Sequence, residues 1–390
     1  HRLDGPWYGA GEALMDFTLS DEQVALSELA AQIFDGSAPV DRVRDVEASD
    51  TRFDRELWAE LAKANLLGAA IPEDHGGLGF GIFELALILE QQGRAVAPVP
   101  LLATLAMGAL PVSEFGATAH GRLLAGVTSG EVILTGAYQE WGANDPFCTS
   151  VRAEQVGDEW VLSGSKPAVP AAHIADRIVI PADTPSGLTL FLVDPASTGV
   201  AMHVADTTNR ELHSQLDLHT VPGEVLGSVG QGRAALTWTL ERVDVAAAAI
   251  AVGCCDQATR MAAEYTSARE QFGRPLSHNQ AVTQRAADCY IGTDAMRLVL
   301  WQAAWRLDAG YPAADAVRVA KWWAAEGGQR VVHDVQHLHG GMGADVDYPV
   351  HRYFLWVKQL ENTLGGGSQQ LARLGRQIAA KAKAAAGTER

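Results

Sequence analysis

The chain has 390 residues, more than one ordinary domain holds, so its length predicts two or three domains with a sizeable core. Its formal net charge of −17, without a cluster of Lys and Arg residues, argues against nucleic acid as a partner. Its longest nearly pure apolar run, Val245 to Cys255, falls well short of the ~20 residues that cross a bilayer, and its four cysteines show no disulfide framework, so we expect a cytoplasmic protein that binds no membrane.

The first segment of the fold is expected to be helical. Residues 1–14 lack the basic start and the apolar stretch of a signal peptide, so we interpret them as an extension that precedes the fold. Helical patterns follow a capping box at Ser20 and recur at residues 53–67 and 83–92, on either side of a Gly-rich loop. These patterns predict an N-terminal helical domain over residues 15–128.

The middle of the chain has a different pattern. Between residues 129 and 227, short β-branched or alternating runs are separated by Gly, Pro and Asp clusters, which is typical of an antiparallel sandwich or barrel. The runs lie at residues 131–135, 159–163, 177–180 and 188–193. We therefore predict a middle β domain over residues 129–227.

Helical periodicity returns in the last part of the chain. Stretches rich in Ala, Leu and Trp predict a C-terminal four-helix bundle over residues 228–390, with an Ala- and Lys-rich tail at 379–386 that we expect to be a frayed, solvated helix end. The helical stretches lie around residues 234–268, 277–307, 312–338 and 349–363. The predicted fold class is thus mainly α with a β middle domain.

Self-contained catalytic motifs are missing from the sequence. It has no G-x-G-x-x-G fingerprint, no P-loop, no H-E-x-x-H and no G-x-S-x-G. His333, His337 and His339 are unevenly spaced for metal ligation, so we expect them to be structural or to contact a cofactor.

Three glycine-containing segments in the C-terminal region point to a bound dinucleotide. They are Arg269–Gly273, His337–Gly343 and Leu364–Gln369. The guanidinium of Arg269 can clamp a pyrophosphate bidentately, and paired glycines let backbone N–H groups approach a phosphate or an adenine. Taken singly, an arginine at a helix end is commonly a partner of the helix dipole, and a Gly pair is commonly a turn. Their combination predicts a dinucleotide bound across a helical surface.

This combination resembles the acyl-CoA dehydrogenase family, whose members have a helical N-terminal domain, a middle β domain and a C-terminal four-helix bundle. The resemblance covers the chain from Met15 to about Ala380. It implies an FAD-dependent oxidoreductase that desaturates an acyl-CoA thioester and passes electrons to an electron-transfer flavoprotein. The motifs that carry it are Phe53–Trp58, Ile71–Gly79, Arg269–Leu276 with Gln280, His339–Gly343, and Tyr348–Val350 with Arg352.

In the family, the C-terminal motifs reach across a dimer interface to the FAD of the neighbouring subunit. By resemblance, Arg269, Gln271 and Phe272 would contact the pyrophosphate and the flavin side of that FAD. Gly340 and Gly341 would lie against its adenine half. The implied cofactor-binding residues are Arg269, Gln271, Phe272, Gln280, His337, Gly340 and Gly341, with His337 in place of the family's usual Gln.

The family's catalytic base has no counterpart in this sequence. The family reaction removes an α-proton with a carboxylate, but the two positions where members carry it are Val243 and Gly365 here, or Leu364 if the second is counted from the other side. None of these residues takes up a proton. The candidate substitutes are Asp244, Glu241 and Glu361, each of which could equally be a solvated or salt-bridged surface carboxylate. A one-residue shift on a helix rotates a side chain by about 100°, so Asp244 should not point where Val243 points.

The segments that would hold the chain's own flavin are altered as well. The family's Thr-Glu-Pro-Gly-Ala-Gly-Ser-Asp stretch is replaced by residues 138–145, of which the last clearly matches. In the family's Lys-x-Trp-Ile-[Ser/Thr]-Asn stretch, Ala168 replaces the Trp and Pro170 replaces the hydroxyl residue. Proline has neither a hydroxyl nor an N–H to offer a flavin.

The sequence thus keeps the motifs that serve a neighbour's FAD, while it lacks the base and the segments for its own flavin. This asymmetry resembles the non-catalytic partner in heterotetrameric acyl-CoA dehydrogenases of actinobacteria, several of which act on CoA thioesters of steroid side chains. We therefore predict a subunit that shares FAD with a second acyl-CoA dehydrogenase chain. Two alternatives remain open: a self-sufficient homotetramer with a relocated base such as Glu361, and a flavin-free scaffold of the same fold.

Overall fold

The N-terminal part of the chain is helical, as predicted. The computed structural model describes residues 15–142 and 145–388. The Ser20 hydroxyl accepts a hydrogen bond from the Gln23 amide N–H (3.2 Å), and Gln23 Oε1 accepts one from the Ser20 N–H (3.0 Å), which completes the predicted capping box. The helices are α1 (Asp21–Ser37), α2 (Val40–Glu47), α3 (Arg55–Lys63), α4 (Ile82–Ala95) and α5 (Leu110–Ser129), with the π-helical segment η2 (Leu102–Ala109) before α5.

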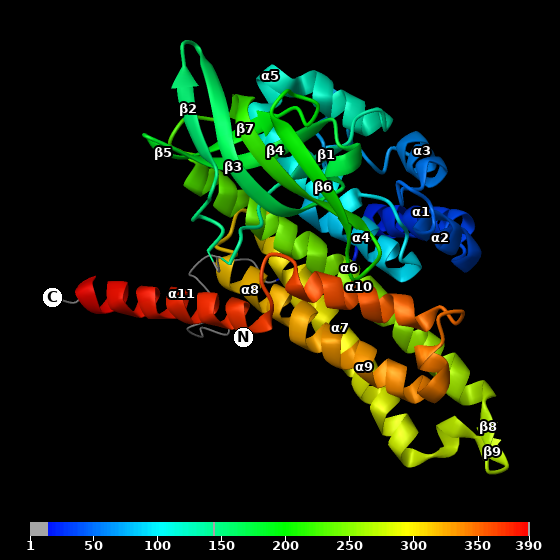
Figure 1. Cartoon of the computed structure of the whole chain (residues 1–390). Helices are drawn as coiled ribbons and strands as arrows, with labels where there is room; N and C mark the ends of the chain where they lie inside the picture. The colour runs from blue at the N-terminus through cyan, green and yellow to red at the C-terminus, as the bar shows by residue number, and fades with distance from the viewer. Residues whose placement is uncertain (1–14, 143–144, 389–390) are drawn as a thin grey trace.

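A seven-stranded barrel forms the middle of the molecule (Figure 1). The sheet order is β1-β4-β2-β3-β7-β5, the additional pairing of β5 with β4 closes the barrel, and β6 pairs with β7. Several strands gave no distinct signal in the sequence, because they show no regular alternation of apolar and polar residues, as in the mostly solvent-facing β2 and β6. The strands are β1 (Leu134–Gly136), β2 (Arg152–Val156), β3 (Glu159–Pro170), β4 (Arg177–Thr184), β5 (Gly187–Val193), β6 (Val200–Asp206) and β7 (Leu212–Leu226).

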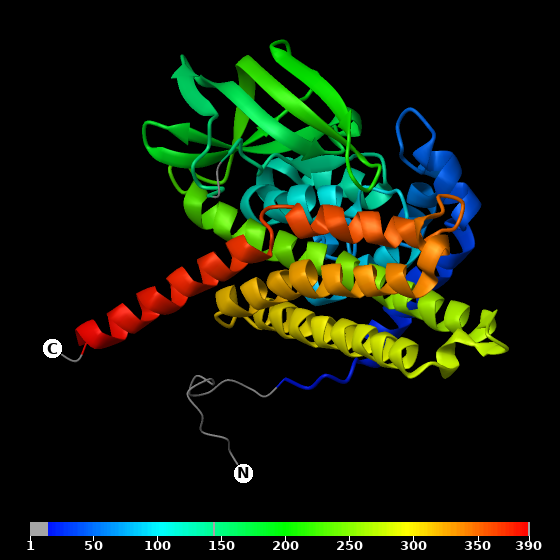
Figure 2. The same ribbon diagram turned by 60° about the horizontal axis from the view of Figure 1, so that its bottom comes forward.

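The C-terminal part is a helical bundle beneath the barrel (Figure 1). The helix expected at 312–338 is interrupted by the π-helical segment η5 (Trp323–Gly327). The tail expected to fray continues a long helix, α11, which projects away from the rest of the bundle in Figures 1 and 2, in keeping with the high helix propensity of alanine and lysine. The helices are α6 (Gly232–Ala268), α7 (Gln280–Asp308), α8 (Ala314–Trp322), α9 (Gly328–His339), α10 (Val350–Asn362) and α11 (Gly367–Thr388).

Two glycines allow α4 of the N-terminal domain to lie directly against α6 of the bundle. A Cβ atom on Gly93 would come within 2.1 Å of the Ile250 carbonyl oxygen, and one on Gly253 within 1.9 Å of the Glu90 carbonyl oxygen. Real Cβ atoms do not approach backbone atoms so closely, so the backbones can meet only where the side chains are absent. The crossing fixes how the N-terminal domain sits on the bundle.

Buried ion pairs connect the same layers. Arg297 on α7 donates to Glu90 on α4 (2.8 and 2.9 Å) and to Asp256 on α6 (3.2 Å). Arg352 on α10 lies 2.9 Å from Glu47, which also accepts from Arg210 before β7 (3.0 Å). These networks join helices from both ends of the sequence around the junction of the three domains.

Candidate functional site

Two of the three predicted dinucleotide segments, Arg269–Gly273 and His337–Gly343, lie together at one end of the bundle. The third, Leu364–Gln369, does not join them, because it follows α10 and lies beside Tyr138 and Glu140 of the middle domain. At the end that carries the first two segments, α6 ends before Arg269, a hairpin of β8 (Glu270–Gln271) and β9 (Arg274–Pro275) follows, and α7 begins. The rings of Tyr265 on α6 and His339 on α9 stack with centroids 4.8 Å apart, so the last turns of the two helices adjoin. We call residues 269–280 and 337–344 the bundle end.

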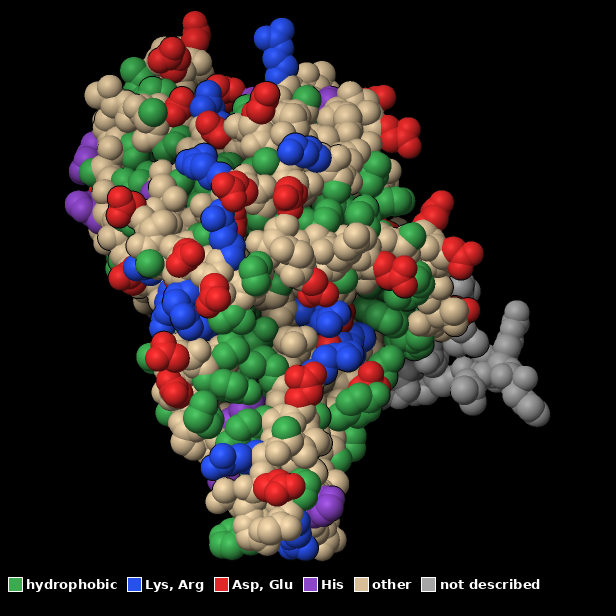
Figure 3. Space-filling model, turned by 90° about the vertical axis from the view of Figure 1, so that its right-hand side faces the viewer, with side chains coloured by type: hydrophobic (Ala, Val, Ile, Leu, Met, Phe, Trp, Pro, Cys, Tyr) green, Lys and Arg blue, Asp and Glu red, His purple; other side chains and the backbone are tan. Residues whose placement is uncertain are grey.

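The bundle end is exposed. All seven residues that the sequence predicted as cofactor contacts are solvent-accessible. No ion pair engages the guanidinium of Arg269 within the part of the chain that the structure describes. Figure 3 shows the molecule narrowing toward this end, with Lys or Arg and His side chains on its surface. The seven are Arg269, Gln271, Phe272, Gln280, His337, Gly340 and Gly341.

Phe272 is the most unusual residue of the bundle end. Its side chain is 99% exposed, and its backbone has a φ of 56°, in the left-handed region. This conformation costs a non-glycine residue roughly 1–2 kcal/mol, and an exposed phenyl ring gains nothing from burial. A strained, fully exposed aromatic ring indicates a contact with something outside the chain.

The Gly pair leaves open space above the backbone. A Cβ atom built on Gly340 or on Gly341 would meet no atom within 4 Å. Gly340 has a φ of 58°, which favours glycine, and directly follows the last residue of α9. The backbone at these two positions is therefore open to a ligand from outside the chain.

The positions expected for a catalytic base carry no free carboxylate. Val243 is fully buried, and the adjacent Asp244 forms a buried ion pair with Arg318 (2.7 Å). Glu361 is paired with Lys358 (2.9 Å). Burial raises the pKa of Glu241, and nearby arginines oppose the rise. Asp244 and Glu361 are thus engaged with cations of their own chain.

Gly365, the other predicted base position, has a backbone conformation that disfavours an acidic side chain. Its φ is 112°, and a Cβ atom there would lie 2.5 Å from Gln369 Oε1 and 3.5 Å from the Arg373 guanidinium. The neighbouring Leu364 is buried. A glutamate at this position would require both the backbone and Gln369 to move.

The segments that would serve the chain's own flavin form contacts within the chain, and Pro170 also lines the central pocket described below. Lys166 forms a buried ion pair with Glu140 and donates to Thr149 Oγ1 (2.9 Å). Ala168 lies in an irregular part of β3 with a φ of 48°. The Pro170 carbonyl oxygen accepts a hydrogen bond from the Thr135 hydroxyl (2.7 Å).

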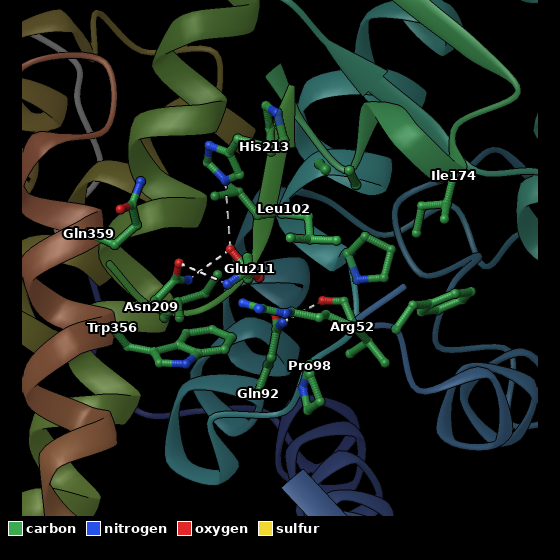
Figure 4. A pocket seen from close by; sticks show the side chains of 18 of the residues that line it. Arg52, Gln92, Pro98, Leu102, Ile174, Asn209, Glu211, His213, Trp356 and Gln359 are labelled. Carbon is green, nitrogen blue, oxygen red and sulfur yellow. Dashed lines mark hydrogen bonds and ion pairs between the residues drawn. The ribbon is translucent and has the colours of Figure 1, made fainter. Parts of the chain in front are cut away.

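A second region, which we call the central pocket, lies where α4, η2, α6, the start of β7 and α10 meet (Figure 4). Its cavity volume is about 70 Å³, and the pocket is partly open to solvent. The sequence gave no signal for it, because its residues come from separate elements and form no motif. Its apolar walls include Val99, Leu102, Ala103, Met107, Ile250 and Trp356.

Polar side chains gather on one side of the central pocket. Glu211 accepts a hydrogen bond from Asn209 Nδ2 (2.8 Å) and lies 3.9 Å from His213 Nε2. Figure 4 shows these three residues opposite Gln92 of α4, with Trp356 and Gln359 contributed by α10. Glu211 is a carboxylate at the pocket that the sequence analysis missed, since it lies in the turn before β7, away from every motif.

The described residues form neither a metal site nor a membrane-spanning helix. Within 15–142 and 145–388, no group of three His, Cys, Asp or Glu side chains could hold a metal ion. No helix in this part of the chain is long and apolar enough to cross a membrane.

Comparison with known proteins places both ends of the chain in one family. Residues 20–131 match the acyl-CoA dehydrogenase N-terminal domain, and residues 230–381 match the acyl-CoA dehydrogenase C-terminal domain. The acyl-CoA dehydrogenase FadE27 of Mycobacterium tuberculosis is 37% identical over 375 residues, which cover 94% of this chain and 99% of that protein. FadE28 of the same organism is 35% identical over 347 residues, 88% of this chain and 98% of that protein.

Solved structures agree with these relatives. A Tcur3481–Tcur3483 steroid ACAD variant has a TM-score of 0.89 and 48% identity, covering 94% of this chain and all of that chain. The ChsE4–ChsE5 complex from Mycobacterium tuberculosis has a TM-score of 0.88 and 37% identity, covering 94% of this chain and 99% of that chain. The chain belongs to the acyl-CoA dehydrogenase family of FAD-dependent oxidoreductases that act on CH–CH bonds.

Proposed function

We propose that this chain is the partner subunit of a heteromeric acyl-CoA dehydrogenase. It contributes the bundle end to an FAD held mainly by a second, catalytic chain, and it supplies no catalytic base. The names of two similar structures support this proposal, because one is a steroid ACAD and the other a complex of two different chains. We accordingly propose a CoA thioester of a steroid side chain as the substrate of the assembled enzyme and an electron-transfer flavoprotein as its acceptor.

The observation that carries the proposal is the contrast between exposed FAD motifs and a missing base. Arg269 and Phe272 are exposed, and their side chains have no ion-pair or hydrogen-bond partner among the described residues, while the Gly340–Gly341 pair leaves open space above its backbone. Val243 and Gly365 stand where the family carries its carboxylate. Such a chain keeps the half of the site that serves a neighbour but lacks the half that abstracts the proton. It is therefore suited to work only beside that neighbour.

The bundle end fits part of a dinucleotide cofactor. Arg269 would hold the pyrophosphate through charge-assisted hydrogen bonds, and Phe272 would lie against the flavin side. Gly340 and Gly341 would let the backbone approach the adenine half, where a Cβ atom would otherwise stand. Bound FAD supplies the hydride acceptor of the family's reaction, and this chain's residues bind and orient it.

The flavin content of the purified chain tests the proposal without a choice of substrate. The chain would be produced alone and together with candidate acyl-CoA dehydrogenase chains, and the visible spectrum and FAD-to-protein ratio would be recorded. We expect a colourless protein alone and a yellow complex with the catalytic chain. A yellow protein with about one FAD per chain when purified alone would contradict the proposal and favour a self-sufficient homotetramer, in which Glu361→Gln should then abolish turnover.

A further inference from the structure

We propose that Tyr265, His339 and Tyr348 position the FAD contacts of the bundle end. We call these three side chains the ring cluster. The inference rests on the proposed function and deepens it, because it assigns residues that act on Arg269 and Gly340 and are not among the seven predicted contacts. Each is a positioning residue, since it acts through the backbone of a neighbouring contact residue.

The ring cluster joins three separate segments of the chain. Tyr265 lies in the last turn of α6, His339 is the last residue of α9, and Tyr348 lies just before α10. The ring of His339 stacks on that of Tyr265 with centroids 4.8 Å apart and planes at 27°, and it lies 5.3 Å from the ring of Tyr348. The two tyrosine rings meet edge to face at 6.3 Å. All three distances are ones at which aromatic rings attract, so the cluster holds the three segments together.

On the α6 side, the ring cluster anchors the turn that carries Arg269. The Arg269 N–H donates to the Tyr265 carbonyl oxygen (2.8 Å), and the Arg269 carbonyl oxygen accepts from the Leu276 N–H (2.9 Å). Of residues 264–268, all but Tyr265 and Thr266 are exposed. Because helix ends fray where few side chains anchor them, the ring of Tyr265 limits the motion of the backbone at Arg269.

On the α9 side, the ring of His339 is fixed directly beside the Gly pair. His339 is 2% exposed, and its Nδ1 lies 2.8 Å from the Val335 carbonyl oxygen. Since a carbonyl oxygen only accepts, Nδ1 donates this hydrogen bond. Gly340 is the next residue, and at the other end of the glycine segment Gln336 Nε2 donates to the Gly343 carbonyl oxygen. The segment is therefore held at both ends, with the buried ring at one of them.

The spacing between the two contacts is what the ring cluster controls. A dinucleotide must meet Arg269 and the Gly340 backbone at once, although they belong to the ends of different helices. The cluster connects to the first through Tyr265 and to the second through His339. Contacts that are already spaced favour binding, because the ligand does not have to order them. The cluster thus contributes to FAD affinity through these two contacts.

The FAD affinity of the complex with the catalytic chain tests this role, measured by fluorescence titration of the FAD-free complex. His339→Ala removes the central ring and should weaken FAD binding about fivefold or more. His339→Phe keeps an aromatic ring and should bind FAD as the wild type does. His333→Ala on the same helix is the matched control, because the His333 ring contacts Phe354 at the same centroid distance of 4.8 Å, and its loss should leave FAD affinity unchanged. Equal affinities of the wild type and His339→Ala would overturn the proposal.

A double-mutant cycle separates positioning from packing. Spacing matters only while both contacts are present, so in the Arg269→Ala background His339→Ala should cause little further loss of FAD affinity. A loss as large as in the wild-type background would show that the ring only stabilises the fold, and would overturn the proposal. Thermal unfolding identifies the folded variants, and Tyr265→Leu replaces His339→Ala in the cycle if that variant does not fold.

The same titrations distinguish this inference from the proposed function. A wild-type complex that binds no FAD, or one whose FAD affinity is unchanged by Arg269→Ala, would overturn the proposed function and the inference with it. A complex whose FAD affinity falls with Arg269→Ala but not with His339→Ala would overturn the inference alone.

Discussion

The bundle end and the central pocket of this chain have opposite properties. The bundle end is exposed, carries the family's motifs and holds a strained aromatic ring in solvent. The central pocket lies inside the molecule between several elements, and Val243 and Gly365, which stand where the family carries its base, are not among the residues that line it. The family's motifs therefore persist on an exposed surface, while the two positions at which the resemblance places a base carry no carboxylate.

The largest expected effect comes from breaking the network that holds both regions in place. Arg297→Ala would leave Glu90 buried without the cation paired with it and would remove one of three arginines from Asp256, which should lower the free energy of unfolding by about 3–5 kcal/mol. Arg260→Ala is the matched control, because it removes an exposed partner of the same Asp256 at i,i+4 and should cost less than about 0.5 kcal/mol. Urea unfolding measures both values, and equal losses would show that the buried network does not join the layers.

The second effect concerns the bundle end alone. In the complex with the catalytic chain, Arg269→Ala should weaken FAD binding by roughly 10- to 150-fold, since a charge-assisted hydrogen bond contributes about 1.5–3 kcal/mol. The free energy of unfolding should barely change, because Arg269 is exposed and unpaired within the described chain. Fluorescence titration with FAD measures the affinity, with Arg152→Ala on the barrel surface as the control. An unchanged FAD affinity would instead favour the flavin-free scaffold.

The smallest effect is a pH dependence at the bundle end. Burial lowers the pKa of His339 below its ordinary value of 6.5, so the unfolded chain binds the proton at a higher pH than the folded chain does. His339 therefore contributes stability above about pH 6.5 that is lost as the pH falls through the folded pKa. His339→Phe keeps the ring beside Tyr265 and should lose less stability than the wild type between about pH 7.5 and about pH 5.5. Urea unfolding at both pH values measures this, and identical losses would contradict it.

The sequence singled out candidate residues at the bundle end but none in the central pocket, and the reason is physical. Arg269 and Phe272 follow a long helix within five residues of one another, so a local motif identifies them. Gln92 and His213 meet in the pocket only because α4, the barrel and the bundle pack together. Contacts between residues so far apart in the chain leave no periodicity or spacing in a single sequence.

The sequence predicted which parts of the chain are helical and which part is a β domain. It predicted the individual helices and strands less well. The apolar period of the long helices was strong enough to identify them. The interruption at η5 was missed, because a π-helical segment keeps an almost helical pattern. The tail at 379–386, expected as a frayed and solvated helix end, is the last part of the longer helix α11, in keeping with the helix propensity of alanine and lysine. Strands with solvent-facing residues on the barrel likewise gave too weak an alternation.

The contact between α4 and α6 limits how sequences with this fold can diverge. Gly93 and Gly253 admit no side chain, since even a methyl group would overlap a carbonyl oxygen of the opposite helix. A mutation at either position must push the helices apart, and Gln92 and Ile250 beside the contact would move with them. Evolution can therefore alter the shape of the central pocket through these two glycines without replacing any residue that lines it.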